Sequence, residues 1–327
     1  MLYSIYFLIS FLGVLIPLLI SVAYLTLMER KIMGAIQRRQ GPNIVGLFGF
    51  LQPIADGAKL FAKETIFPSS ANLIIFFISP ILTFFLSILS WLFIPLNITG
   101  LCLDINLGIM YLLAISSLGI YGVLSSGWSS NSKYALLGSL RSTVQLISYE
   151  ISIGLILISI LVCVGSLNLI HIFFFQKTQW FIVPLPGLFF LFYISILAET
   201  NRSPFDLPEG ESELVAGFNV EYAAMGFALF FLGEYSNMIL MCSIGTIFFF
   251  GGGFEPLSIF FFKWIPFSLW FSIKSTFLLF GFILIRASFP RQRYDQLMFL
   301  GWKIFLPLSL SFVFFIASFL LRNNSLN

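Results

Sequence analysis

Long apolar runs alternate with short polar segments along this chain. Several of the runs exceed 18 residues and show no strict alternation of apolar and polar positions, which predicts helices rather than β-strands. Because lipid offers no partner to backbone polar groups, such runs cross a bilayer as helices. The pattern predicts an all-α polytopic membrane protein with eight transmembrane helices. These spans are expected at about residues 2–28, 72–94, 105–126, 142–164, 181–198, 215–250, 257–286 and 300–321.

The run over residues 215–250 decides the number of spans. At about 1.5 Å per residue it would reach roughly 54 Å as one helix, well beyond a hydrocarbon core of about 30 Å. It therefore fits either one long tilted helix or two short helices. With one helix, 13 of the 17 Lys and Arg residues fall on the same side of the membrane. The positive-inside rule then favours eight spans with both termini on the other side.

Residues 44–64 have a different pattern, with an apolar stripe and a polar stripe at helical spacing. The apolar stripe is Leu47, Phe50, Leu51, Ile54, Ala58 and Phe61, and the polar stripe is Gln52, Asp56, Lys59 and Lys63. This pattern is typical of an amphipathic helix lying in the membrane interface. A helix packed against other protein at the membrane edge would show the same pattern, and the sequence does not separate the two.

Composition agrees with a membrane protein, here read as a single membrane domain over residues 1–327. The chain is 59% hydrophobic and 9% charged, whereas soluble domains carry about 25% charged residues. No basic run is suited to nucleic acid. The three cysteines lie far apart and lack metal-binding spacing, and His171, the single histidine, is expected in an outer loop without converging ligands.

An acidic segment follows the fifth expected span. We expect an acidic inner loop over residues 199–214, on the same side as most of the basic residues. Glu209, Glu211 and Glu213 are close in sequence, so their mutual repulsion is expected to raise the pKa of some of them and to let the group hold a proton. A solvated acidic loop is the plainer interpretation of the same residues.

Three further carboxylates, Glu150, Glu221 and Glu234, fall inside the expected spans. A carboxylate at that depth is costly and is usually functional. On one straight helix, Glu221 and Glu234 would differ by a rotation of about 220° and a rise of about 20 Å. They would therefore face different neighbours, so a proton relay between them requires water or other side chains.

Five polar motifs identify a resemblance. They are ERKIMGAIQRRQGPN at 29–43, GFLQPIADGAKLFAKE at 49–64, ISYE at 147–150, AETNRSPFDLPEGESELVAGFNVEYAA at 198–224 and RYDQLM at 293–298. The chain resembles the subunit 1 family of respiratory NADH dehydrogenase (complex I), of the mitochondrial type. With the order of the spans, the resemblance covers nearly the whole chain.

The resemblance implies a core membrane subunit of a proton-pumping NADH:ubiquinone oxidoreductase, not catalytic alone. It implies a channel through which quinone enters and a carboxylate path that couples quinone reduction to proton translocation. The path would use Glu150, Glu199, Glu209, Glu211, Glu213, Glu221 and Glu234, and the channel would use Arg30, Asp56, Arg202, Phe205, Asp206 and Arg286. Ubiquinone would be the substrate, while NADH, FMN and iron–sulfur clusters would belong to other subunits.

Partners and location are implied in the same way. The partners would be the other subunits of the membrane arm, the quinone-reducing peripheral arm and membrane lipids. The location would be the mitochondrial inner membrane, with the charged loops facing the matrix. The 42 Phe residues fit an AT-rich coding sequence, as in many organelle genomes.

Two other readings remain open. An independent ion transporter or proton-coupled transporter would also hold buried carboxylates, but it should work alone in vesicles. The related membrane subunit of energy-converting hydrogenases would not handle quinone, and labelling with a photoreactive quinone analogue would separate it.

Overall fold

The computed structural model describes residues 2–96, 105–206, 216–256 and 264–322. The regular elements in these ranges are helices, and none of the residues described there forms a β-strand. In chain order they are α1 (Leu2–Ile36), η1 (Leu47–Gly49), α2 (Gln52–Ala62), α3 (Leu73–Trp91), α4 (Gly108–Ser129), α5 (Lys133–Val164), α6 (Leu169–Phe175), α7 (Pro186–Glu199), η2 (Gly217–Asn219), α9 (Ala224–Phe249), α10 (Phe267–Ser288), α11 (Tyr294–Phe299), η4 (Leu300–Phe305) and α12 (Leu306–Arg322). The expected all-α membrane fold is confirmed.

Seven helical segments of the described chain are long and apolar enough to cross a membrane. They comprise α1 from Ser10, α3, α4, α5, α9, α10 and the continuous helix Tyr294–Arg322. The remaining predicted span contains α7, which has 14 residues and a length of about 21 Å. This is shorter than a hydrocarbon core of about 30 Å, so the number of eight stays a prediction.

The expected long run over residues 215–250 is divided in the structure. A 3-10 turn covers Gly217–Asn219, and α9 begins only at Ala224. Gly217 and Ala224 both have positive φ angles, 59° and 52°, which a continuous α-helix does not allow. Glu221 therefore lies in the turn before α9, and it does not share a helix with Glu234.

Three other elements differ from the sequence expectation. The amphipathic helix α2 is shorter than residues 44–64, because Gly46 and Gly49 have positive φ angles and interrupt the segment before it. Helix α5 begins at Lys133 rather than near residue 142. Its first turns are helical, but they contain too many polar residues to be recognised as part of an apolar span from the sequence. His171 lies in the short helix α6 instead of a loop.

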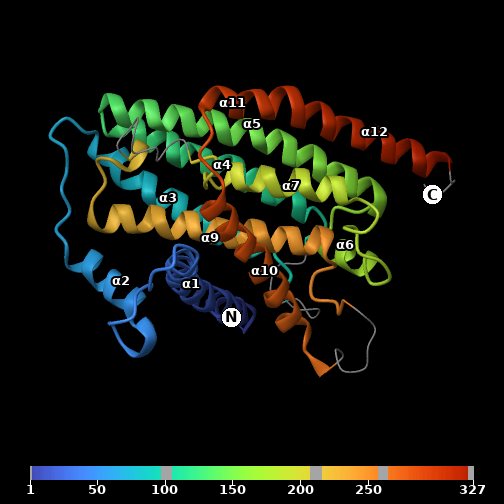
Figure 1. The fold of residues 1–327 in the computed structure, drawn as a ribbon, viewed down its shortest axis with the longest axis horizontal. Helices are drawn as coiled ribbons and strands as arrows, with labels where there is room; N and C mark the ends of the chain where they lie inside the picture. The colour runs from blue at the N-terminus through green and yellow to red at the C-terminus, as the bar shows by residue number, and fades with distance from the viewer. Residues whose placement is uncertain (1, 97–104, 207–215, 257–263, 323–327) are drawn as a thin grey trace.

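Helices α5 and α9 form the centre of the fold (Figure 1). Helix α5 packs against α4, α7 and α12, and α9 packs against α3, α10, α1 and α2. Of the seven spanning helices, α9 is the most enclosed and the C-terminal helix is the least. Polar side chains on α5 and α9 are thus the ones best shielded from lipid.

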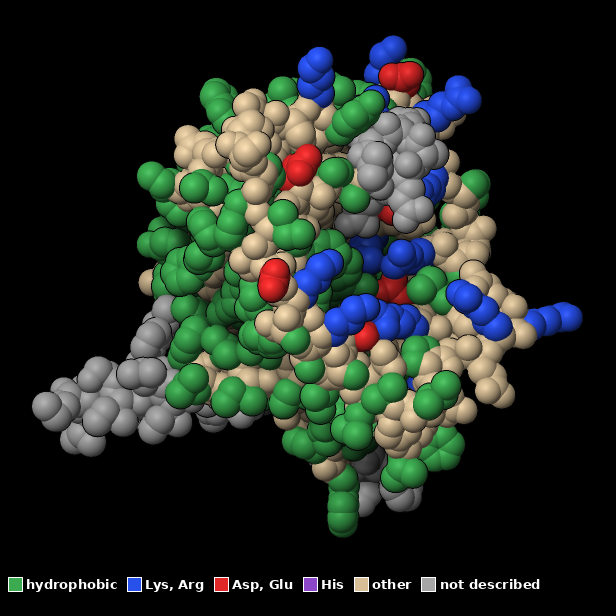
Figure 2. Space-filling model, turned by 90° about the vertical axis from the view of Figure 1, so that its left-hand side faces the viewer, with side chains coloured by type: hydrophobic (Ala, Val, Ile, Leu, Met, Phe, Trp, Pro, Cys, Tyr) green, Lys and Arg blue, Asp and Glu red, His purple; other side chains and the backbone are tan. Residues whose placement is uncertain are grey.

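Basic side chains gather at one end of the molecule. Helices α3, α5 and α9 begin at the left of Figure 1, where α4 and α7 end. Figure 2 views this end and shows many Lys and Arg side chains near its centre, with some acidic groups among them and hydrophobic side chains beside them. The gathering of basic residues agrees with the charge-parity argument for a common side.

Candidate functional site

A buried carboxylate, Glu29 on α1, is the centre of the first site. Its exposed fraction is 4%. The Tyr235 hydroxyl on α9 donates a hydrogen bond to Glu29 Oε2 at 2.6 Å. Glu29 Oε1 accepts a hydrogen bond from Arg286 on α10 and lies 3.8 Å from Arg202 Nη1. We call Glu29, Arg202, Tyr235 and Arg286 the Glu29 cluster.

Charge balance within this cluster depends on Glu29. The Arg202 guanidinium lies over the Tyr235 ring at 4.3 Å from its centroid, and its side chain is 11% exposed. A single carboxylate therefore stands between two guanidinium groups at a site shielded from water. Removing one member of a buried ion pair leaves an uncompensated charge, which is far costlier than losing an exposed pair.

The chain reverses direction directly after α7, and this turn positions Arg202. Arg202 N donates to Leu197 O at 3.1 Å, Asn201 N donates to Ala198 O at 3.3 Å, and Asn201 has a φ of 50°. These are the bonds of a Schellman motif, in which a residue in the left-handed region ends the helix. The motif keeps Glu199 in the last helical turn while Arg202 leaves the helix toward α1.

The segment after this turn is fixed to the connection between α10 and α11. Gln292 N donates to Pro204 O at 3.0 Å. Arg291 Nη2 lies 3.6 Å from Asp206 Oδ2, and Asp206 is buried while the Arg291 side chain is about half exposed. The Asp206–Arg291 pair therefore joins the segment that follows Arg202 to the connection between α10 and α11.

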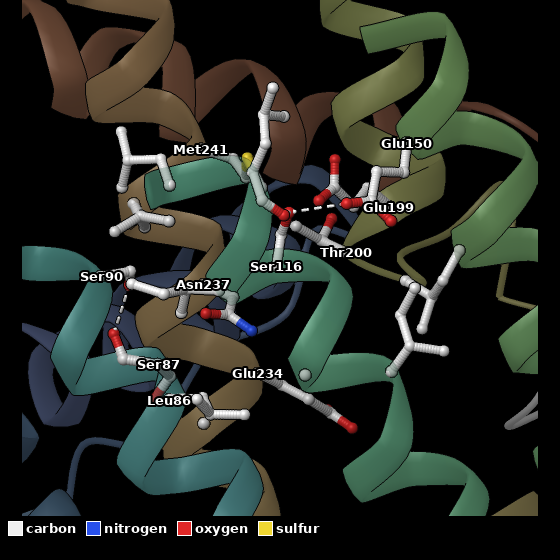
Figure 3. A pocket seen from close by; sticks show the side chains of 18 of the residues that line it. Leu86, Ser87, Ser90, Ser116, Glu150, Glu199, Thr200, Glu234, Asn237 and Met241 are labelled. Atoms are coloured by element: carbon white, nitrogen blue, oxygen red, sulfur yellow. Dashed lines mark hydrogen bonds between the residues drawn. The ribbon is translucent and has the colours of Figure 1, made fainter. Parts of the chain in front are cut away.

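A cavity with a mainly apolar lining and a few polar side chains is the second site. It has a volume of about 130 Å³, and its lining includes Glu150, Glu199 and Glu234 from α5, α7 and α9. Figure 3 shows Glu150 and Glu199 directed toward one another, with Asn237 between this pair and Glu234. A cavity of this size can hold water molecules beside its carboxylates, since one water occupies roughly 30 Å³ of liquid volume.

Hydrogen bonding differs among the cavity carboxylates. Ser116 Oγ on α4 donates to Glu150 Oε1 at 3.1 Å. The Glu199 Oε2 atom is buried and has no hydrogen-bond partner among the described residues. Buried polar atoms in proteins are nearly always paired with protein or ordered water. Glu150 and Glu199 can exchange a proton through water in this cavity, whereas the Glu234 carboxylate lies apart from them (Figure 3).

Two short stretches of chain join the cavity to the Glu29 cluster. On α9, Glu234 lines the cavity while the next residue, Tyr235, binds Glu29. After α7, Glu199 lines the cavity while Arg202, three residues on, lies beside Glu29. The cluster and the cavity are therefore built in part from neighbouring residues of the same two segments.

The predicted site residues are not all brought together. Glu150, Glu199 and Glu234 line the cavity, and Arg202 and Arg286 meet at Glu29.

Other predicted site residues lie outside these two sites. Arg30 and Asp56 form a separate, largely exposed pair between α1 and α2, at 2.7 Å. Phe205 is buried, with its ring centroid 6.3 Å from that of Tyr149. Glu221 is partly buried in the turn before α9, and Glu209, Glu211 and Glu213 lie outside the described residues.

Sequence reasoning missed the group at the centre of the site. Glu29 was expected only to end the first span together with the bases that follow it, yet α1 continues to Ile36. An acid at the start of the basic run Glu29–Arg30–Lys31 was the available signal. Tyr235, Ser116 and Asn237 gave none, because hydroxyl and amide residues are common in helices. No group of three or more His, Cys, Asp or Glu residues within the described ranges could hold a metal ion.

Comparisons with known proteins match nearly the whole chain. A family model described as NADH dehydrogenase matches residues 9–317. The chain is 65% identical over 317 residues to NADH-ubiquinone oxidoreductase chain 1 of Chondrus crispus, covering 97% of each chain. It is 61% identical over 310 residues to the protein of that name from Cyanidium caldarium, covering 95% of this chain and 90% of the relative. It is also 60% identical over 300 residues to the protein of that name from Arabidopsis thaliana, covering 92% of each.

Proposed function

The chain belongs to the family of NADH-ubiquinone oxidoreductase chain 1, a membrane subunit of respiratory complex I, and we propose that it forms part of the quinone channel and the start of a proton-coupling carboxylate path. The resemblance expected from the sequence motifs is confirmed. As a subunit, it contributes to NADH:ubiquinone reductase and is not catalytic alone. The observation that carries the proposal is the direct connection between the Glu29 cluster and the carboxylate cavity.

The quinone route is proposed to pass the Glu29 cluster. Helices α1, α9 and α10 pack against one another there, and Arg202 and Arg286 supply N–H donors for the carbonyl oxygens of a quinone head group. Arg30 and Asp56 would line the route between α1 and α2, and Asp206 would close it toward Arg291. Phe205 would hold the turn that carries Asp206, because it is buried against Tyr149.

The carboxylate path is proposed to begin next to this route. Glu199, Glu150 and Glu234 line one cavity, and Glu221 precedes the helix that carries Glu234. A change of charge beside Arg202 and Glu29 during quinone reduction would shift the proton affinity of these nearby carboxylates. Glu209, Glu211 and Glu213 are included as the expected start of the path.

We propose the partners and the location by analogy with the mitochondrial relatives. We infer that NADH, FMN and iron–sulfur clusters are bound by other subunits, and that subunits of the membrane arm and of the quinone-reducing peripheral arm cover this chain together with lipids. The basic end in Figure 2 would face the matrix of the mitochondrial inner membrane, where the positive-inside rule places such residues. An organelle gene is the proposed source.

Substitution of the path carboxylates tests the coupling role. Glu199→Gln, Glu221→Gln and Glu234→Gln should each slow quinone reduction by about 100-fold, the lower end of what a positioned acid–base group contributes. Oxidation of NADH by an artificial acceptor should be unchanged, because it does not use the membrane subunit. Glu64→Gln is the matched control, since Glu64 is exposed and outside both sites.

The decisive readouts are quinone reduction and proton translocation in membranes that contain the assembled enzyme. Loss of quinone reduction in the three path variants, with Glu64→Gln unchanged, supports the proposal. Full quinone reduction and full translocation in all three path variants would contradict it.

A further inference from the structure

A single buried amide closes the turn that joins the two sites. Gln145 on α5 has an exposed fraction of 0%. Its Nε2 atom donates to Ala198 O at 2.7 Å and to Phe205 O at 3.0 Å. One amide group thus binds the chain immediately before Glu199 and immediately before Asp206.

The backbone hydrogen bonds within this turn are local to its two halves, residues 197–202 and residues 202–205. Phe205 N donates to Arg202 O at 2.8 Å, and the bonds of the Schellman motif fix residues 197–202. These contacts shape the two halves of the turn separately. Gln145 binds both halves, because one of its N–H groups reaches the end of α7 and the other reaches Phe205.

The groups projecting from this turn are those that connect the sites. Glu199 lines the cavity, Arg202 lies at Glu29, and Asp206 pairs with Arg291. We propose that Gln145 is a positioning residue that holds this turn, and with it Glu199 and Arg202, in place against α5. It touches neither proposed reacting group and acts through the backbone of residues 198–205. This inference rests on the proposed function, because it assumes that Glu199 belongs to the coupling path.

Gln145→Met is the variant that tests this role. Methionine has a similar length and no N–H group, so it removes both hydrogen bonds without adding charge. A shift of about 1 Å in a working group can cost roughly 100-fold in rate. The turn keeps its backbone hydrogen bonds in this variant, so we expect quinone reduction to slow by about tenfold or more. Oxidation of NADH by an artificial acceptor should not change.

Gln176→Met is the matched control. Gln176 is likewise fully buried, and its Nε2 donates to Ile247 O at 2.7 Å. It joins α6 to the end of α9, away from both sites. It should reduce the thermal stability of the assembled enzyme to a similar degree and leave the quinone rate per assembled enzyme unchanged. Equal loss of the quinone rate in both variants would overturn the inference, since general loosening would then explain it.

A double-mutant cycle with Glu199→Gln separates positioning from structure. If Gln145 acts through Glu199, the double variant should be no slower than Glu199→Gln alone, because coupled residues are not additive. Losses that multiply would overturn the positioning role and leave the proposed function standing. A full rate in Glu199→Gln alone would remove Glu199 from the coupling path and overturn this inference, whereas the proposed function fails only if Glu221→Gln and Glu234→Gln are also fully active.

Discussion

Helix α10 places two basic side chains in buried surroundings of opposite kinds. Arg286, near its end, binds the Glu29 carboxylate in a cluster built from side chains of four segments. Lys274 lies twelve residues earlier, about 18 Å along the helix. Its Nζ donates to the backbone carbonyls of Phe250, Gly252 and Phe254 at 2.7, 3.0 and 2.5 Å.

The nature of the partners separates a structural charge from a working one. The last carbonyls of a helix lack intrahelical partners, and a cation at this end satisfies them. Lys274 binds carbonyls from the C-cap Phe250 and from the turn that follows α9, and it also lies 4.2 Å from the centroid of the Trp180 ring. Side-chain partners can move or change charge, whereas a helix end cannot. An ionisable residue within a membrane is by default taken to be functional. Lys274 shows that such a residue can instead have a structural role when its partners are backbone carbonyls.

The strongest way to break the comparison is Glu29→Gln. It removes the carboxylate that binds Arg286 and lies beside Arg202, and loss of one partner of a buried pair costs about 3–5 kcal/mol. We expect little assembled enzyme and almost no quinone reduction, measured by the yield of the complex and its rate. Adding Arg286→Gln should recover assembly, because it removes the uncompensated charge. No recovery in the double variant would show that Glu29 does not serve to balance Arg286.

Lys274→Met tests the structural side of the comparison. Hydrogen bonds from a charged donor contribute about 1.5–3 kcal/mol each, but the variant also removes a costly buried charge, so the net loss should be about 2 kcal/mol. Thermal inactivation of the assembled enzyme should occur at a lower temperature, while its quinone rate stays within about twofold of the original. A normal stability together with a large loss of quinone rate would place Lys274 with the working charges.

Ser116→Ala asks whether a neutral hydrogen bond to a cavity carboxylate affects coupling. The variant removes the bond to Glu150, worth about 1 kcal/mol, which corresponds to a change of about fivefold in rate. Ser117→Ala is the control, because the Ser117 hydroxyl binds only carbonyls of its own helix among the described contacts. Proton-coupled quinone reduction that falls equally in both variants would argue against a specific role for Ser116.

Asp56→Asn should have the smallest effect. Its pair with Arg30 is largely exposed, and exposed pairs contribute less than about 1 kcal/mol. We expect a change in quinone rate of less than about threefold. The change should shrink further at high ionic strength, where salt screens exposed charges. An effect as large as that of Glu29→Gln at every ionic strength would mean that exposure is a poor guide to these charges.

The sequence predicted the fold class and the carboxylates of the cavity for clear reasons. Apolar length and internal backbone pairing leave helices as the only form for such runs, and Glu150 and Glu234 were conspicuous as charges within them. The boundary near Glu221 was not predictable, because the chain stays apolar through a turn that depends on backbone angles at Gly217 and Ala224.

The charged cluster shows the other limit of sequence reasoning. Glu29 and Arg286 are 257 residues apart in the chain, and no local pattern indicates that they meet. Arg202 was expected to bind carboxylates, but its partner could not be named from spacing. Gln145 gave no signal, since in the sequence a buried amide that binds backbone looks like any polar residue near the start of an apolar span.

Photoreactive quinone labelling of the assembled enzyme tests the central claim most directly. The account predicts that the label attaches within residues 29–64 and 199–235, near Arg202 and Tyr235, and that excess unmodified quinone prevents it. Attachment that avoids both regions while other subunits are labelled would contradict a quinone route beside the Glu29 cluster.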